Sequence, residues 1–309
     1  MLCAHVGFIL DVYNPGLMFE ITQPNRRMDD AHAIRVLPRP KRRKKRTRLL
    51  FSLALIVIYF FAPLRTNFLL LGTDDSPERG SVGRTDTIIL ISVVPLKPYI
   101  GILSIPRDLW VEIPGIGEQR INTAYFFAEA NQAGTGGKAA METIHENFDV
   151  PVRYYAVIHM LGLVSVIDAL QGVDIELETS MGELSAGGHH LNGIQVLDFV
   201  RERSTSDDFG RMKRTQILLS ATLLKMINPS GWQNLPRAVL ALVQTVDTNL
   251  PLWQWPRLLF ALLRALIFGV DSRVVSRQMV IPFQTSQGAQ VLAPNWDVLR
   301  PVLSEMFGR

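Results

Sequence analysis

Arginines gather in one stretch of this chain, Arg201 to Gln216, which reads RERSTSDDFGRMKRTQ. Arginine side chains match the oxygens of phosphate groups in pairs. Arg211 and Arg214 are three residues apart and share one face of a predicted helix start, where cations oppose the helix dipole unless an anion also binds there. The stretch therefore predicts a phosphate or pyrophosphate site. The alternative is a solvated basic helix face paired with Asp207 and Asp208.

Two carboxylates form a second candidate site. Asp74 and Asp86 lie at opposite ends of one polar loop, each beside a predicted strand. The loop could bring them together at a sheet edge. Their hard oxygen ligands suit Mg²⁺, or Mn²⁺ in its place, with water and substrate phosphate completing the coordination shell. Ordinary loop capping is the alternative for both. Arg107 follows another predicted strand, and a surface salt bridge to Asp108 or Glu112 would also explain it.

Other kinds of site find little support. Four histidines could suggest a metal centre, but they come without cysteine partners or H-x-x-H spacing, so structural or solvent-facing roles are favoured; they are His145, His159, His189 and His190. The sequence contains neither a G-x-S-x-G elbow nor a Walker loop. The single cysteine, Cys3, excludes an intramolecular disulfide.

Helical patterns flank the arginine-rich stretch. Ile194, Leu197 and Val200 recur at helical spacing, so Arg201 and Arg203 should leave the end of a short helix. Asp208 is the predicted N-cap of a longer helix, whose apolar positions are Ile217, Leu218, Leu224 and Ile227. Both ends of the stretch would then be held by helices.

Apolar runs and helical patterns alternate through the rest of the chain, which predicts an α/β sheet covered on both faces. The predicted strands are Asn67–Leu71, Thr87–Val94, Ile100–Ile105, Tyr154–His159, Gly172–Leu177 and Met279–Phe283. The second and third should form a hairpin buried on both faces. The predicted helices are Ile121–Asn131, Lys138–Phe148, Leu161–Leu170 and Trp296–Phe307, with Leu258–Val270 as a core or groove-lining helix.

A basic run and an apolar run mark the N-terminal part. Residues 41–48 read KRRKKRTR, and the uncharged Leu49–Leu64 follows directly. This predicts a cytoplasmic tail over residues 1–48, an uncleaved signal anchor over 49–64 and an extracytoplasmic domain over 67–309. The net charge is +4, but seven positives lie in the basic run, so the remainder carries −3. A generic nucleic-acid binder is therefore not expected.

Seven segments, in this order, resemble the LytR-CpsA-Psr family of cell-wall glycopolymer ligases, over about Asn67 to Phe307. They are LLLGTDDS, GRTDTIIL, SIPRDLWVEIPG, RINTAYFFA, LGLVSVIDALQGVDIEL, LNGIQVLDFVRER and DDFGRMKRTQ. The resemblance implies a three-layer α/β/α sandwich around a mixed sheet, behind one transmembrane helix, with an apolar tunnel for a polyprenyl chain. Family members transfer a glycopolymer from polyprenyl pyrophosphate to a peptidoglycan hydroxyl. The expected partners are thus this lipid-linked donor, peptidoglycan and membrane lipid.

The resemblance also implies residue roles. Asp74 and Asp86 would hold Mg²⁺, and Asp86 or Asp208 is the candidate general base. Arg107 would stabilise the transition state. The family usually has glutamine directly after the second arginine of the last motif, whereas here Thr215 stands there and Gln216 follows. The pyrophosphate would be surrounded by Arg84, Arg107, Arg201, Arg203, Arg211, Arg214 and Gln216.

Two other functions stay open on the sequence alone. A hydrolase would use the same site with water as the acceptor. A non-enzymatic regulator would bind nucleic acid through the basic run at residues 41–48. Because that run adjoins an apolar helix, membrane topology explains it more simply.

Overall fold

The computed structural model describes residues 43–61, 65–74, 82–94, 99–202 and 208–308. Contacts divide the chain into two units, residues 1–57 and 58–309. Helix α1 (Arg43–Phe61) begins in the first unit, and its side chains from 47 to 58 are exposed. Among the described residues, no helix combines the length and the apolar character that crossing a membrane requires. The signal anchor at residues 49–64 thus stays a prediction.

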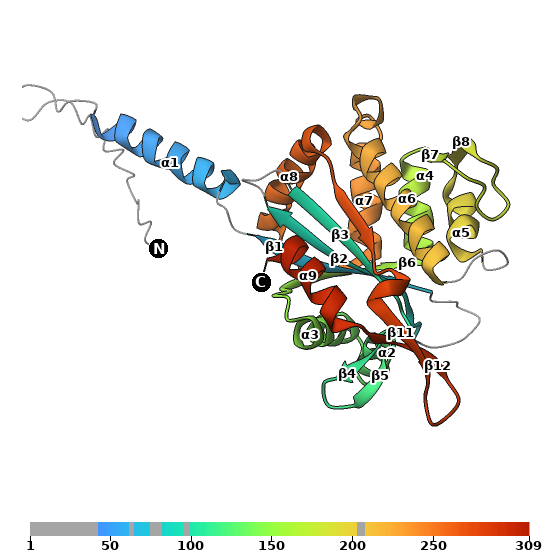
Figure 1. Ribbon diagram of the computed structural model, residues 1–309. Helices are drawn as coiled ribbons and strands as arrows, with labels where there is room; N and C mark the ends of the chain where they lie inside the picture. Colours follow the sequence, from blue (N-terminus) through green and yellow to red (C-terminus); the bar gives the residue numbers. More distant parts are fainter. Residues whose placement is uncertain (1–42, 62–64, 75–81, 95–98, 203–207, 309) are drawn as a thin grey trace, which may run out of the picture. The chain divides into compact units, whose positions relative to one another are not determined.

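A mixed sheet of six strands forms the centre of the second unit (Figure 1). The spatial order is β10-β3-β2-β1-β6-β9. The strands are β1 (Thr66–Thr73), β2 (Thr85–Val94), β3 (Tyr99–Ile105), β6 (Tyr154–His159), β9 (Val246–Thr248) and β10 (Asp271–Val274). β1 runs antiparallel to β2 and parallel to β6, while β3 is antiparallel to β2 and parallel to β10. The predicted mixed sheet is confirmed.

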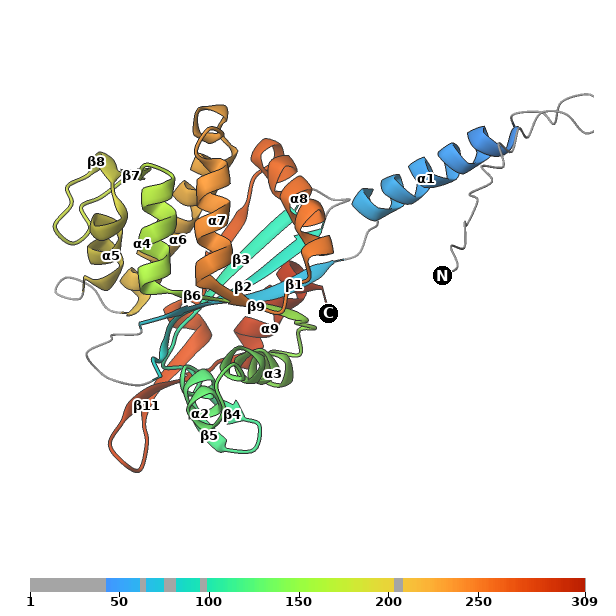
Figure 2. The same cartoon turned by 180° about the vertical axis from the view of Figure 1, so that it is seen from behind.

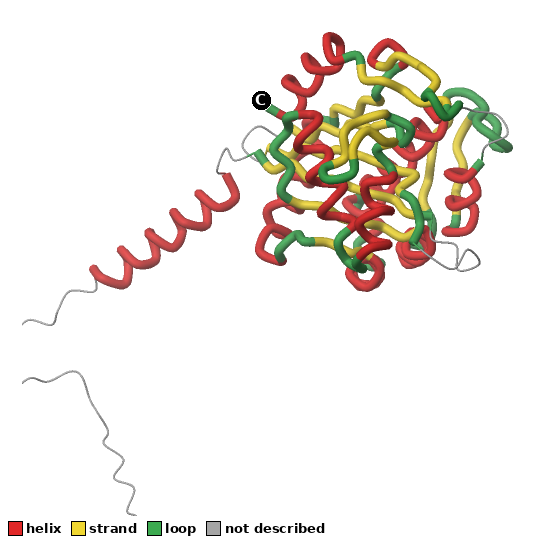
Figure 3. The backbone as a smooth tube through the Cα atoms, turned by 90° about the horizontal axis from the view of Figure 1, so that it is seen from below, coloured by secondary structure: helices red, strands yellow, loops and turns green. Residues whose placement is uncertain are grey.

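The apolar strands are buried on both faces because alternate residues enter different cores. On β2, Ile88 and Leu90 belong to one core, and Ile89 and Ile91 belong to the other. Helices α2, α3 and α9 supply the first core, and α6 and α8 supply the second. Figure 2 shows α2, α3 and α9 on one side of the sheet and α6 and α8 on the other, and the view from below shows helices in front of the strands (Figure 3). The result is the predicted three layers.

The described helices of the second unit agree closely with the sequence patterns, except the one at Leu235–Thr245, which was not predicted. They are α2 (Thr123–Asn131), α3 (Gly136–Phe148), α4 (Met160–Ala169), α5 (Gly193–Arg201), α6 (Asp208–Ile227), α7 (Leu235–Thr245), α8 (Trp255–Phe268) and α9 (Trp296–Phe307). Short 3₁₀ turns occur at Pro229–Gly231, Leu252–Gln254 and Arg277–Met279. The predicted core helix at Leu258–Val270 corresponds to α8, whose Leu258 and Ala261 pack against the sheet.

Three two-stranded ribbons lie outside the central sheet. They pair β4 (Trp110–Ile113) with β5 (Gly117–Arg120), β7 (Val173–Leu177) with β8 (Gly187–Leu191), and β11 (Val280–Gln284) with β12 (Gln290–Pro294). The predicted strand at Gly172–Leu177 therefore exists as β7, but its expected place in the central sheet is wrong. Its exposed Asp174 and Glu176 alternate with buried residues, so it suits a ribbon with one wet face.

Candidate functional site

Strand register brings the predicted site residues together at the ends of three neighbouring strands, β1, β2 and β3. Thr73 pairs with Thr85, so Asp74 and Asp86 lie at neighbouring strand ends. Ile88 pairs with Ile105 in the antiparallel β2–β3 hairpin. Continuing this register by two residues places Asp86 across from Arg107, which explains how these two side chains meet.

Arg107 contacts three carboxylates. Its Nη1 donates to Asp86 Oδ1 at 2.7 Å, and its Nε lies 3.3 Å from Asp208 Oδ1 and 3.5 Å from Asp108 Oδ2. Burial tends to lower the pKa of this guanidinium, but the hydrogen bond and charge of Asp86, followed by Asp208 and Asp108, raise the pKa overall. The alternative pair with Asp108 is thus present, but it belongs to a larger network.

Asp208 begins α6 and joins the network from the other side. It is the first residue of the helix rather than the predicted N-cap, a difference of one residue. Its Oδ1 lies 3.0 Å from Arg211 Nη2, while its Oδ2 is buried with no hydrogen-bond partner among the described residues. Burial raises the pKa of Asp208, and Arg211 and Arg107 oppose the rise. Oδ2 therefore keeps an acceptor position that no described residue uses.

Arg211 and Arg214 are buried on α6, with exposed fractions of 8% and 2%. Arg211 Nη1 lies 4.0 Å from Asp86 Oδ2. Arg214 donates to the backbone carbonyl of Glu202, and its Nη1 lies 3.9 Å from Glu202 Oε2. Burial lowers the pKa of Arg214, against the charge of Glu202. Neither arginine lies on a solvated basic face, so that alternative is wrong for both.

The other predicted arginines are held more loosely. Arg201 ends α5 and donates to Asp74 Oδ1, and its side chain is 42% exposed. That helix begins with a capping box, in which Asn192 and Gln195 exchange side-chain and backbone hydrogen bonds. Arg84 is exposed and lies over the ring of Phe126, 5.6 Å from its centroid. Arg203 lies outside the described residues.

The Gln216 side chain contacts the central sheet. Its Nε2 donates to Ser104 Oγ on β3 at 3.0 Å and to the Arg273 carbonyl on β10 at 2.5 Å. The Thr215 hydroxyl donates to the Arg211 carbonyl at 3.0 Å within the helix. The two Gln216 contacts fasten α6 to the sheet, and they give Gln216 a structural role that the sequence did not suggest.

The two predicted metal ligands fit a hard cation by chemistry. Asp74 and Asp86 present carboxylate oxygens from neighbouring strand ends, with side chains 14% and 16% exposed. The described residues contain no group of three or more His, Cys, Asp or Glu side chains suited to a metal. An ion here would need water and substrate oxygens, which is typical of Mg²⁺.

The histidines make ordinary contacts in the structure. Three of them have side-chain or backbone partners away from the arginine network: His145 meets the Val150 carbonyl, His189 the Ser185 carbonyl, and His190 the Asp174 carboxylate. His159 Nδ1 lies 3.0 Å from the hydroxyl of Thr73, which precedes Asp74. His159 therefore pairs, in the β1–β6 register, with the residue that directly precedes Asp74.

One member of the network, Arg120, was missed, whereas the sequence suggested Asp108 only as a surface partner of Arg107. Asp108 lies between Arg107 and Arg120, with its Oδ1 3.1 Å from Arg120 Nε. Arg120 is the last residue of β5, and the polar sequence GEQR of this strand did not predict a strand. No pattern in the sequence linked Arg120 to Asp108.

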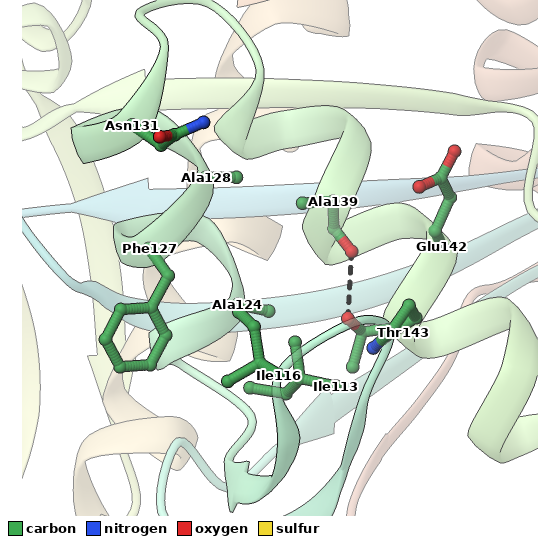
Figure 4. Close-up of a pocket in the computed structure, with 10 residues that line it drawn as sticks. Ile113, Ile116, Ala124, Phe127, Ala128, Asn131, Ala139, Glu142 and Thr143 are labelled. Atoms are coloured by element: carbon green, nitrogen blue, oxygen red, sulfur yellow. Dashed lines mark hydrogen bonds between the residues drawn. The ribbon is translucent and has the colours of Figure 1, made fainter.

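An apolar cavity of about 370 Å³ lies between the β4–β5 ribbon, α2 and α3. Small residues at its centre, including Ala124, Ala128 and Ala139, leave this space open, and Asn131 and Glu142 lie at its margin (Figure 4). Its volume is at the lower end for small-ligand pockets. The predicted tunnel for a long polyprenyl chain stays a prediction.

Comparisons with known proteins agree with the motifs. The LytR_cpsA_psr family profile matches residues 63–294. Over 195 residues the chain is 31% identical to the regulatory protein MsrR of Staphylococcus aureus (strain Mu50), covering 60% of this chain and 57% of that protein. It is 33% identical over 192 residues to the polyisoprenyl-teichoic acid–peptidoglycan teichoic acid transferase TagU of Bacillus cereus, covering 60% of each. The chain thus spans less than two thirds of these curated relatives.

Solved structures share the fold. A structure of TagT bound to LIIa-WTA has a TM-score of 0.64 at 24% identity and covers 79% of this chain and 91% of that one. TagV of B. subtilis has a TM-score of 0.65 at 23% identity, covering 79% and 98%. At these identities the likeness concerns the arrangement of helices and strands.

Proposed function

The chain belongs to the LytR-CpsA-Psr family, and from this premise we propose that it transfers a glycopolymer from a polyprenyl-pyrophosphate carrier to peptidoglycan. The main support is the ion-pair network at the strand ends, which joins Arg107, Asp86, Asp208 and Arg211. Paired guanidinium groups beside carboxylates suit a substrate that has both phosphate oxygens and a hydroxyl. The name of the TagU relatives describes a transfer of this kind.

In the proposed reaction, a hydroxyl oxygen of peptidoglycan attacks the phosphorus that carries the glycopolymer. A new phosphorus–oxygen bond forms, and the bond from that phosphorus to the bridging oxygen breaks. Polyprenyl phosphate leaves with the bridging oxygen, and the hydroxyl proton passes to a base. Such a step depends on charge stabilisation and alignment, because no covalent enzyme intermediate is needed.

The buried arginines supply the charge stabilisation. Arg107 and Arg211 already lie together beside Asp86 and Asp208, and Arg214 lies one helical turn further along α6. When pyrophosphate enters, its oxygens can take guanidinium hydrogen bonds that the carboxylates hold in its absence. Donors that are already positioned cost little reorganisation during the reaction.

Asp208 is the better proton acceptor of the two candidates. Both oxygens of Asp86 face arginines, at 2.7 Å from Arg107 and 4.0 Å from Arg211. Asp208 keeps a buried Oδ2 with no hydrogen-bond partner among the described residues. Burial also raises its pKa, which makes its carboxylate a stronger base than an ordinary aspartate.

Asp74 and Asp86 would hold Mg²⁺, or Mn²⁺ in its place. The bound ion would neutralise part of the charge on the pyrophosphate. Asp86 would then join the metal site to Arg107, with which it pairs directly. The domain would lie outside the cytoplasm behind a single membrane anchor at residues 49–64, close to a lipid-linked donor.

Hydrolysis at the same site is the main alternative, and one experiment separates the two. The purified full chain is incubated with radiolabelled lipid-linked glycopolymer, with and without peptidoglycan. Transfer predicts label bound covalently to peptidoglycan and little release in its absence. Free polymer phosphate that forms equally with or without peptidoglycan would instead establish a hydrolase.

A regulator that binds nucleic acid would require a cytoplasmic domain. A C-terminal alkaline phosphatase fusion is expected to be active, because that enzyme needs the oxidising space outside the cytoplasm. Activity of a cytoplasmic reporter at the same position would contradict the proposed location.

A further inference from the structure

The charge around Arg107 involves an arginine outside the predicted site. Arg120 Nε lies 3.1 Å from Asp108 Oδ1, and Arg120 Nη2 donates to the Gln290 carbonyl at 3.1 Å. The other oxygen of Asp108 lies 3.5 Å from Arg107 Nε. Asp108 therefore bridges Arg120 and Arg107.

The backbone holds this bridge in place. The Arg107 carbonyl accepts from Asn122 N at 3.3 Å, and the Asp108 carbonyl accepts from Leu292 N at 3.1 Å. The Leu109 carbonyl accepts from Ile121 N at 2.8 Å. Segments after β5 and in β12 thus fix three successive residues, so the side chains of the bridge start from a constrained backbone.

Arg120 balances charge that would otherwise oppose an anion. Asp86, Asp108 and Asp208 all face Arg107, and Arg211 is the second arginine among them. Without Arg120, three carboxylates would face two guanidinium groups, and the excess negative charge would repel pyrophosphate. With Arg120 paired to Asp108, the charges are equal.

We propose that Arg120 is a positioning residue for the pyrophosphate site and acts through Asp108. It neutralises this carboxylate and holds it, so that Asp108 neither repels the substrate nor draws Arg107 away from it. The inference rests on the proposed function, because it concerns how the same site attracts its anion.

Binding of inorganic pyrophosphate to the purified full chain, measured by calorimetry, tests this role. Arg120→Gln is expected to raise the Kd about tenfold, since it exposes a carboxylate charge near the ligand. Asp108→Asn in the same chain should return the Kd to within about threefold of wild type, because it removes that charge. A merely structural role for Arg120 would not be rescued by this second substitution.

Two further variants keep the test independent of folding. Arg120→Lys preserves the charge and should bind within about threefold of wild type. Asp108→Asn alone should bind pyrophosphate at least as tightly as wild type, since it removes a negative charge. Tenfold weaker binding by Asp108→Asn would overturn the inference even if Arg120→Gln did not fold.

Arg273→Gln is the matched control. The Arg273 side chain is 33% exposed, as is that of Arg120, and it pairs with Asp271 and Glu305 outside the site. This variant should bind pyrophosphate like wild type. Arg107→Ala distinguishes a failure of the positioning role from a failure of the proposed site. If it weakens binding while Arg120→Gln does not, the positioning role is wrong and the site stands; if Arg107→Ala binds normally, the proposed site fails.

Discussion

At the scale of single residues, the arginines of the site differ in how firmly they are held. The side chains of Arg214 and Arg211 are 2% and 10% exposed, whereas the side chain of Arg201, which reaches Asp74, is 42% exposed. A buried arginine keeps its orientation when the ligand arrives, and an exposed one must be ordered. Arg107 lies between these extremes, with a side chain that is 24% exposed.

Arg107→Ala should nearly abolish transfer. The loss of one preorganised donor removes about 3 kcal/mol of transition-state stabilisation, or roughly 10²–10³ in rate. The rate is measured with labelled lipid-linked donor and peptidoglycan, and circular dichroism checks the fold. A folded variant that keeps more than about a third of the wild-type rate would exclude Arg107 from the pyrophosphate site.

Asp208→Asn tests the proton acceptor through pH. Only the ionised carboxylate can take a proton, and burial raises the pKa of Asp208. The wild-type rate should therefore fall on acidification at a higher pH than an ordinary aspartate would give, while the residual rate of the variant should lack this acid limb.

Thermal melting of Asp208→Asn gives the matching control. Because the folded-state pKa is raised, the ionised carboxylate lowers stability as pH rises from the ordinary pKa through the raised one. Removing the charge should not lower the melting temperature at neutral pH. A marked fall would show that Asp208 serves the fold through its arginine pairs.

Asp74→Asn tests the metal. If Asp74 and Asp86 share Mg²⁺, EDTA should remove activity, and added Mg²⁺ or Mn²⁺ should restore it. The variant should need a metal concentration at least about tenfold higher than wild type for the same activity. Asp74 is chosen because its arginine partner, Arg201, is exposed, whereas Asp86 pairs with the half-buried Arg107 at the centre of the network. Unchanged metal dependence with a lower melting temperature would point to loop capping instead.

At the scale of elements, α6 must be fastened so that Asp208, Arg211 and Arg214 meet the strand ends. Gln216 links it to β3 and β10 through Ser104 and the Arg273 carbonyl. Gln216→Ala should cost about 1 kcal/mol or more of unfolding free energy for each lost hydrogen bond. Urea unfolding measures this cost. Pyrophosphate affinity at low temperature, where the fold is intact, should stay within about threefold of wild type.

Sequence patterns predicted the elements whose residues leave little choice. The β-branched runs of β2 and β3 form the expected hairpin, and α9 has the predicted bounds, Trp296–Phe307. Short polar strands such as β5 and β10 went unpredicted, because only their partners make them strands. Arg120 lies in one of these strands, so its contacts were not predicted. The contacts of Gln216 were not predicted either, because they depend on where α6 meets the sheet.

At the scale of the whole molecule, a network at the far end of β3 contributes to stability. The Tyr99 hydroxyl donates to Asp271 Oδ2 at 3.0 Å, and Arg273 joins Asp271 to Glu305 on α9. Burial, together with the hydrogen bond and charge of Asp271, raises the pKa of Tyr99 to about 12. The folded protein therefore keeps this phenol protonated where the unfolded chain begins to ionise.

Tyr99→Phe should be less stable than wild type near pH 8, by about 1 kcal/mol for the lost hydrogen bond. Wild-type stability should then fall between an ordinary tyrosine pKa of about 10 and the raised value, because only the unfolded state releases the proton. The variant lacks this term, so the difference should shrink as pH rises. Urea unfolding near pH 8, and again at a pH between the two pKa values, measures the difference in unfolding free energy between the variant and wild type. A difference that does not change with pH would contradict the raised pKa of Tyr99.

The two edges of the central sheet are β9 and β10, which read VDT and DSRV. Both are short, and both carry an aspartate, whereas the strands between them are long and apolar. A long apolar edge would offer its free backbone groups to another chain and so promote aggregation. The short, charged edge strands of this sheet are therefore expected to disfavour pairing with the edge of another chain, although the strands between them are rich in β-branched residues.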